Sequence, residues 1–203
     1  MIDNIELIKP LLDFSDPEDF YVLYVFKRKK DLAANEKSNH QSVRTIKSYC
    51  IESVEHLESR YEEIKQLCEL FKARAYIHVQ KQNHRDVSLE MMISLAEKIR
   101  NGQHRQQYLF DSVVGQLKTH ESRWIVDVDT KDEITVHRVA HIIDGVRPEG
   151  PKTVAVIPTK SGYHFITKRF DVMEFQKQMS QYGEVPDIQK KNPTLIYFPT
   201  SLT

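Results

Sequence analysis

Residues 123–130 read Arg-Trp-Ile-Val-Asp-Val-Asp-Thr, an apolar segment that ends in two acidic residues. Tryptophan, isoleucine and valine favour β-strands, so the segment predicts a short strand over 124–128. Side chains two residues apart on a strand point to the same side, so Asp127 and Asp129 present two carboxylates together. Like charges this close repel each other, and a hard cation such as Mg²⁺ or Mn²⁺ relieves the repulsion. The pair therefore predicts a divalent-cation site. The alternative is a strand that ends in a turn capped by one aspartate.

A second polar cluster follows at residues 160–164, Lys-Ser-Gly-Tyr-His, where a turn is expected to enter a strand. Gly162 permits close approach of the backbone, and Lys160, Ser161 and His164 supply hydrogen-bond donors. Donors of this kind suit the anionic oxygens of a triphosphate. For His164 alone, a strand histidine with satisfied hydrogen bonds is the alternative. The cluster as a whole favours phosphate binding.

The rest of the chain mixes helical and strand patterns. Apolar residues at steps of three and four predict a helix over 53–72, and they are Val54, Leu57, Tyr61, Ile64, Cys68 and Phe71. Strands are predicted at 20–26, 73–79, 153–158, 163–167 and 194–198. Further helices are predicted at 87–99, 133–143 and 172–181, and loops at 33–42 and 101–107. With a hairpin in the second half, this order predicts an α+β fold. We expect a mixed or antiparallel sheet, ferredoxin- or RRM-like in that half and covered by helices.

Composition limits the partners and the compartment. Lys plus Arg and Asp plus Glu both number 29, so the net charge is zero and nucleic-acid binding would require a local basic patch. The two cysteines, Cys50 and Cys68, match no zinc-ligand spacing and no disulfide framework, so a cytoplasmic location is expected. The acidic N-terminus does not resemble a signal peptide, and no apolar run approaches the roughly 18 residues of a membrane span.

The order of the polar motifs resembles the signature of the archaeo-eukaryotic primases, a superfamily that includes primase-polymerases and the polymerase domain of bacterial end-joining ligases. That signature has an acidic pair on a strand, a Ser-x-x-His or Ser-x-His motif on a later strand, and a single acid before a final strand. In this chain Asp127 and Asp129 match the first motif, Ser161 and His164 the second, and Asp187 the third. The resemblance covers about residues 74–199.

The third acid has alternatives within the same region. Pro186 precedes Asp187 where the family carries an apolar residue, so Asp171 or Glu184 could take the role instead.

The resemblance implies a catalytic core over residues 73–203. Residues 1–72 would then form a strand and helical appendage that can belong to the same domain. Two Mg²⁺ or Mn²⁺ ions would be held by the catalytic residues Asp127, Asp129 and Asp187 and would assist nucleotidyl transfer to a 3′ hydroxyl. The residues implied for binding the nucleotide phosphates are Lys160, Ser161, His164 and Arg123. The implied partners are nucleoside triphosphates, a single-stranded or primer-template nucleic acid, and a replication protein such as a helicase.

Two other functions are compatible with the same residues. A metal-dependent nuclease also needs clustered carboxylates and a phosphate-binding base. A nucleic-acid-binding adaptor could keep the fold without the chemistry. Arg74, Arg169 and the basic run at 27–30 are further candidates for contacts with phosphate or template, and solvated or ion-paired surface charge is the alternative for each.

Overall fold

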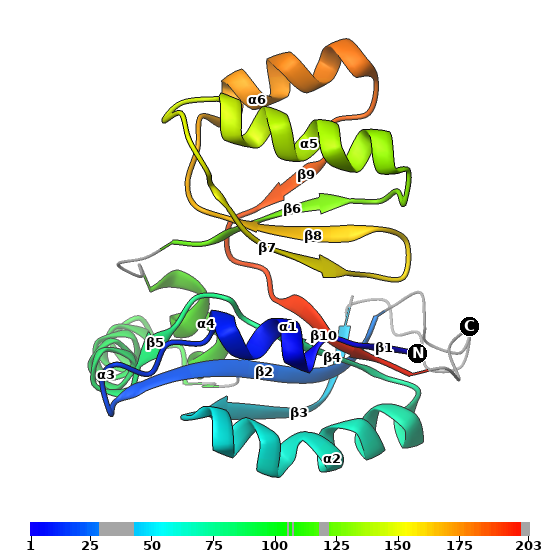
Figure 1. Ribbon diagram of the computed structural model, residues 1–203. Coiled ribbons are helices and arrows are strands. Elements are labelled where there is room, and N and C mark those ends of the chain that lie inside the picture. Colours follow the sequence, from blue (N-terminus) through cyan, green and yellow to red (C-terminus); the bar gives the residue numbers. More distant parts are fainter. Residues whose placement is uncertain (29–42, 105, 107, 118–121, 200–203) are drawn as a thin grey trace.

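The computed structural model describes residues 1–28, 43–104, 106, 108–117 and 122–199. These residues form two antiparallel β-sheets, one above the other in Figure 1, with helices around them. The predicted α+β class is confirmed, and every strand pairing among the described residues is antiparallel. The loop predicted at 33–42 lies outside the described residues.

The first sheet has the strand order β1-β10-β4-β2-β3, and β5 pairs with β2. Its strands are β1 (Ile2–Asp3), β2 (Asp19–Arg28), β3 (Val43–Ile51), β4 (Arg74–Ile77), β5 (Gln82–Asn83) and β10 (Thr194–Phe198). Its helices are α1 (Ile5–Ile8), α2 (Val54–Phe71), α3 (His84–Arg100) and α4 (Leu109–Gln116). Helix α2 lies along the outer side of this sheet (Figure 1). It is the helix predicted at 53–72, and the residues that it buries are Leu57, Tyr61, Ile64 and Cys68.

The second sheet has the order β7-β8-β6-β9. Its elements are β6 (Trp124–Val128), α5 (Glu133–Gly145), β7 (Thr153–Pro158), β8 (Tyr163–Thr167), α6 (Val172–Met179) and β9 (Asp187–Gln189). The chain order β-α-β-β-α-β with this strand order is the ferredoxin-like topology that the sequence predicts.

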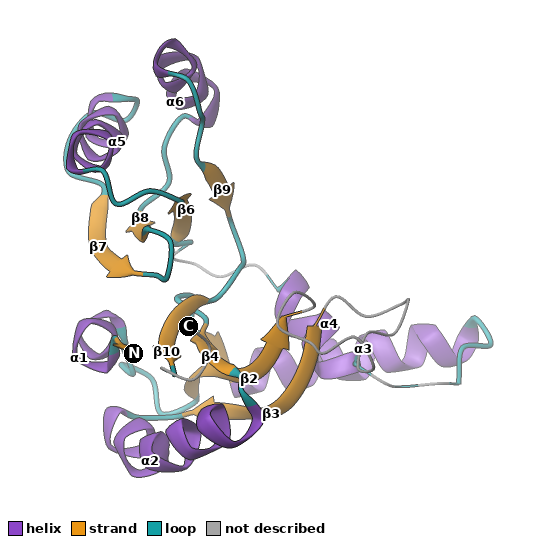
Figure 2. Ribbon diagram, turned by 90° about the vertical axis from the view of Figure 1, so that its right-hand side faces the viewer, coloured by secondary structure: helices purple, strands orange, loops and turns teal. Residues whose placement is uncertain are grey.

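Helices α5 and α6 cover one face of the second sheet, and the other face is turned toward the first sheet (Figures 1 and 2). Val126, Val128 and Phe165 pack under the helices. On the opposite face Ile125, Ile157 and Ile166 belong to the same core as the first sheet and α2, so the two sheets share one apolar core. Asp127 alternates with Val126 and Val128 and therefore points toward the first sheet.

The division into residues 1–72 and 73–203 does not follow the sheets. Strand β4 comes after residue 72, yet it pairs with β2 in the first sheet. Strand β10 returns to the same sheet after the second sheet is complete, and it lies between β1 and β4. Residues on both sides of the predicted boundary therefore form one sheet.

Buried amides connect the two sheets. The side chain of Asn4 donates from Nδ2 to the carbonyl oxygens of Pro158 in β7 (2.9 Å) and Leu195 in β10 (3.0 Å). The side chain of Gln80 donates to the carbonyl oxygens of Arg123 (2.9 Å) and Lys190 (2.6 Å). Such bonds satisfy backbone groups that the junction would otherwise bury without partners.

Within the described ranges, no helix combines the length and apolar character needed to cross a bilayer.

Asn4→Ala is expected to lower the free energy of unfolding by about 2–3 kcal/mol, because it removes two donors and leaves two buried carbonyl oxygens without them. Asn4 is only 2% exposed, so water does not readily replace its amide. Urea unfolding followed by circular dichroism measures the change. Asn192→Ala, at an exposed loop position, is the control and should change stability by less than about 0.5 kcal/mol. Equal stability of the two variants would contradict the role assigned to Asn4.

Candidate active site between the two sheets

Three polar residues form a row across neighbouring strands of the second sheet. In the strand register Asp127 of β6 lies opposite His164 of β8 on one side and Asp187 of β9 on the other. Neighbouring strands are about 4.8 Å apart, so these side chains are neighbours on one face of the sheet. Asp129 follows one residue after β6 ends. The structure thus brings Asp127, Asp187 and His164, which the sequence singled out, into one row.

Side-chain contacts connect the members of this row. Nε2 of His164 lies 3.5 Å from Oδ1 of Asp127. The amide of Gln189 donates to Oδ2 of Asp127 (3.3 Å) and to Oδ2 of Asp187 (3.1 Å), so it bridges two carboxylates. Gln189 carries no sequence signal of its own, but its position two residues after Asp187 on a strand places both side chains on the same face.

Burial and neighbouring negative charge raise the pKa of Asp127. Burial is the largest influence on Asp127 and raises the pKa of its carboxyl group, and the negative charges of Asp129 and Asp187 raise that pKa further. The charge of Arg28 and the hydrogen bond from Gln189 act in the opposite direction. A carboxylate held against this repulsion is one that a cation would stabilise.

His164 is a neutral side chain at pH 7. Burial lowers the pKa of its imidazole to about 4, with an opposing influence from the charge of Asp129. The ring is 7% exposed, and its Nδ1 lies 2.9 Å from Oγ1 of Thr194 in β10. A neutral imidazole carries one N–H donor and one acceptor nitrogen, so the position of its proton decides what it can bind.

Asp127 and His164 of this row, together with Asp129, line a cavity of about 110 Å³ to which both sheets contribute. The residues that line it are Arg28, Arg74, Tyr76, Asp127, Asp129, Thr159, Lys160, Ser161, His164 and Leu195. The structure therefore brings Lys160, Ser161 and His164, predicted as phosphate-binding residues, to one cavity with Asp127 and Asp129.

Arg28 and Arg74 supply positive charge from the first sheet. Arg74 is 4% exposed, and its guanidinium carbon lies 4.6 Å from the centre of the Phe198 ring. Nζ of Lys160 lies 5.5 Å from the same ring, so one aromatic side chain supports two cations. Arg28, at the end of β2, is close enough for its charge to act on both Asp127 and His164. Arg28, Arg74 and Lys160 therefore form a basic wall in the cavity that Asp127 and Asp129 also line.

A second cavity of about 190 Å³ lies on the other side of the acids. The residues that line it are Asp127, Val128, Asp129, Thr130, Thr135, Glu184, Val185, Pro186 and Asp187. Glu184, an alternative third acid, lines this second cavity together with Asp187, and Asp187 also occupies the register position opposite Asp127.

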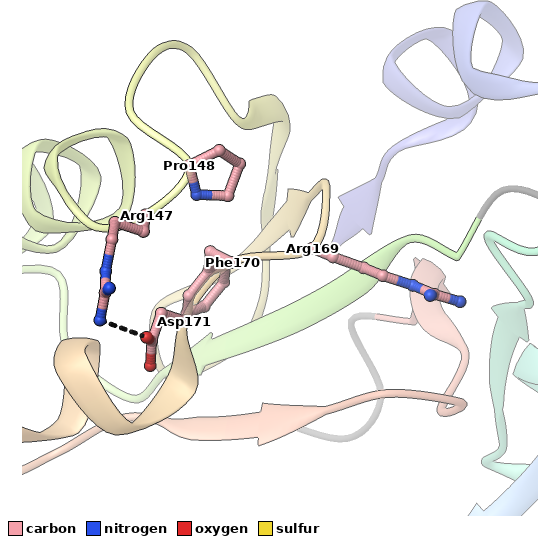
Figure 3. A pocket seen from close by; sticks show the side chains of 5 residues that line it. All are labelled: Arg147, Pro148, Arg169, Phe170 and Asp171. Carbon is pink, nitrogen blue, oxygen red and sulfur yellow. Dashed lines mark hydrogen bonds and ion pairs between the residues drawn. The ribbon is translucent and has the colours of Figure 1, made fainter.

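Asp171, the other alternative, lies elsewhere. It lines an open depression of about 440 Å³ together with Arg147, Pro148, Arg169 and Phe170. Figure 3 shows these five side chains. Its carboxylate accepts the backbone N–H of Glu174 as the cap of α6 and forms an ion pair with Arg147 at 3.2 Å. Arg169 donates to Ser122. The depression contains neither member of the acidic pair, and its Asp171 has a structural role.

The structure does not bring Arg123 to the cavity. Its guanidinium donates to the carbonyl oxygen of Leu11, and its own carbonyl accepts from Gln80. Arg123 precedes β6 and the acids stand at the other end, about 13 Å away at the usual rise of a strand. The predicted phosphate contact of Arg123 thus has no support from this geometry, because a strand separates residues that are close in sequence.

The donor set has the chemistry that hard cations prefer, since three carboxylates meet at one end of a strand. As the side chains stand, no cluster of three His, Cys, Asp or Glu residues arranged to hold a metal occurs in the part of the chain that the structure describes. The Gln189 amide instead lies between two of the carboxylates. Asp127, Asp129 and Asp187 remain the residues that would hold a divalent ion.

No protein-family model matches this chain, and neither a curated protein nor a solved structure matches it.

Gly162→Ala is expected to destabilise the chain by about 3 kcal/mol or more, the cost of a severe clash in a packed region. A Cβ atom at Gly162 would lie 1.9 Å from the carbonyl oxygen of Val128 and 2.7 Å from the nitrogen of Thr130, backbone that flanks Asp129. Thermal unfolding measures the loss. Gly115→Ala in α4 is the matched control, because a Cβ there meets nothing within 4 Å and alanine favours a helix. A Gly162→Ala chain as stable as the wild type would show that the turn at Gly162 does not pack closely against the backbone of residues 128–130.

Asp127→Asn is expected to raise the melting temperature of the chain at pH 7 in metal-free buffer, because it removes a buried charge that two neighbouring carboxylates repel. The folded pKa of Asp127 lies above its unfolded value. At a pH below the unfolded pKa the carboxyl group is protonated in both states and does not lower the free energy of unfolding. As the pH rises through the folded pKa, its ionisation lowers the free energy of unfolding. The advantage of the asparagine variant should accordingly shrink toward pH 3.5. Scanning calorimetry at both pH values tests this, and a variant less stable at pH 7 would contradict it.

Proposed function

We propose that this protein is a metal-dependent nucleotidyltransferase of the primase-polymerase kind, which adds nucleotides to a nucleic-acid 3′ end. The observation that carries the proposal is the row of His164, Asp127 and Asp187, of which His164 and Asp127 line a basic cavity between the two sheets. The resemblance to the archaeo-eukaryotic primases rests on these three residues together with Asp129 and Ser161.

The cavity suits phosphate more than an apolar ligand. Arg28, Arg74 and Lys160 contribute positive charge, and Ser161 and His164 add short-range donors. Together they would hold the β- and γ-phosphates of a nucleoside triphosphate, while Asp127, Asp129 and Asp187 would hold Mg²⁺ or Mn²⁺ beside the α-phosphate. Two such ions, when bound, activate the 3′ hydroxyl and stabilise the pyrophosphate leaving group.

In the reaction, the 3′ oxygen forms a bond to the α-phosphorus as the bond to pyrophosphate breaks. The residues of this chain contribute mainly by position and charge. The basic wall offsets negative charge on the phosphates, and the buried setting of Asp127 and His164 strengthens each electrostatic contact.

The nucleic-acid partner would be a single strand or a primer-template, and the protein would act in the cytoplasm. Because the net charge is zero, the affinity for nucleic acid would depend on local basic residues and would fall as salt rises. A replication protein such as a helicase is the further partner that the resemblance implies.

Primer extension is the direct test. A labelled primer on a single-stranded template is incubated with Mg²⁺ or Mn²⁺ and with ribo- or deoxyribonucleotides. The wild-type chain should extend the primer only when metal is present. Asp127→Asn/Asp129→Asn should slow extension by about a thousandfold, because the loss of metal stabilisation costs several kcal/mol of barrier.

The control for this experiment is Asp86→Asn, a substitution of the same chemistry on the exposed side of α3. It should extend primers at the wild-type rate. A shortened primer would replace the proposal with a metal-dependent nuclease. Metal-independent binding of nucleic acid without either reaction would replace it with an adaptor.

A further inference from the structure

Thr194 of the first sheet is in direct contact with His164 of the second. Oγ1 of Thr194 lies 2.9 Å from Nδ1 of His164, and both side chains are buried, at 0% and 7% exposure. Within the described residues, His164 is the one hydrogen-bond partner of that hydroxyl. The bond joins β10 to β8, so it crosses the junction between the sheets.

The two ends of the imidazole ring indicate where its single proton resides. Nε2 lies 3.5 Å from Oδ1 of Asp127, a distance too long for a good hydrogen bond but short enough for charge to matter. A lone pair on Nε2 would face the lone pairs of a carboxylate, whereas an N–H there would present its positive end. The proton is therefore favoured on Nε2.

The other end of the ring leads to the same tautomer. If Nδ1 carried the proton, it would donate a hydrogen bond to the oxygen of the Thr194 hydroxyl. The hydrogen of that hydroxyl would then be buried without an acceptor among the described residues. If the hydroxyl donates to Nδ1, its hydrogen has a partner, and Nδ1 acts as the acceptor. Both ends are satisfied only by the arrangement with an N–H at Nε2.

We propose that Thr194 is a positioning residue, whose hydroxyl donates to Nδ1 of His164 and so keeps the proton on Nε2, at the cavity. The inference rests on the proposed function in one respect, that the ligand in this cavity is a phosphate group. An N–H at Nε2 can donate to a phosphate oxygen, whereas a bare nitrogen would repel it. Through Thr194, the first sheet thus determines whether Nε2 of His164 binds a hydrogen-bond acceptor, such as a phosphate oxygen, or a hydrogen-bond donor.

The position of the proton can be read by ¹⁵N nuclear magnetic resonance of the histidine rings at pH 7, with His164→Gln used to assign the signal among nine histidines. The wild-type ring should show the proton on Nε2. Thr194→Val keeps the shape and removes the hydroxyl, so the ring should change to a mixture of the two tautomers. Thr194→Ser restores the hydroxyl and should restore the wild-type spectrum.

A second readout is the affinity for inorganic tripolyphosphate, measured by calorimetry at a fixed Mg²⁺ concentration. Thr194→Val should weaken binding by about tenfold, the effect of one misdirected donor to a charged group. Thr194→Ser should bind within about twofold of the wild type.

Thr167→Val is the matched control. Thr167 is a fully buried threonine of β8, the strand of His164, and its hydroxyl has no hydrogen-bond partner in the described part of the chain. Its replacement should leave both the ring spectrum and tripolyphosphate affinity unchanged.

Three results would overturn the proposal. They are a wild-type proton on Nδ1, a Thr194→Val spectrum equal to that of the wild type, and a serine variant that behaves like the valine variant. Failure of the proposed function looks different. In that case the wild-type chain does not bind tripolyphosphate, while the ring spectrum still depends on the hydroxyl of residue 194.

Discussion

Repulsion between carboxylates is the constraint around which this structure is arranged. Asp127 lies half-buried beside Asp187, with Asp129 close by, and burial together with these two negative charges makes the charge of Asp127 costly. The rest of the site offsets that cost in the absence of metal. Gln189 donates to two of the acids, and Arg28 provides an opposing charge. Helices α5 and α6 cover the opposite face of this sheet (Figure 2), and the acids line two cavities.

The two sheets contribute different chemistry to one site. The second sheet carries the acids and His164, while the first contributes Arg28 and Arg74. A shared apolar core and the amides of Asn4 and Gln80 fix the sheets against each other. Distances across the cavity therefore depend on the packing of the whole chain as well as on local strand geometry. This dependence is consistent with a site that must hold an acidic and a basic surface close together.

Sequence patterns predicted the elements whose apolar periodicity is strong, and they identified the acids by the two-residue repeat of a strand. They missed β3, because Lys47 and Ser48 interrupt its apolar residues, and β9, which has only three residues. In α3 the apolar repeat marked the helix, yet Leu89 and Met92 of that repeat are more than half exposed. Sequence patterns named Arg74 and the basic run that contains Arg28 as candidates for phosphate contacts, but they could not distinguish that role from solvated or ion-paired charge. Their place follows from the pairing of β2 with β4 and from the packing of one sheet on the other, and neither is encoded by a local pattern.

The return of β10 to the first sheet has a consequence for how the protein is made. Ile2 pairs with Phe198, and Thr194 with Ile77, so the first sheet closes only when residues 194–198 are available. On a ribosome, β1, β2 and β4 would emerge long before their last partner, and the acid-bearing sheet would be synthesised in the interval. Contacts of such large sequence separation form late and slowly. A nascent chain that stops short of β10 would carry all three acids but lack the strand that brings Thr194 to His164.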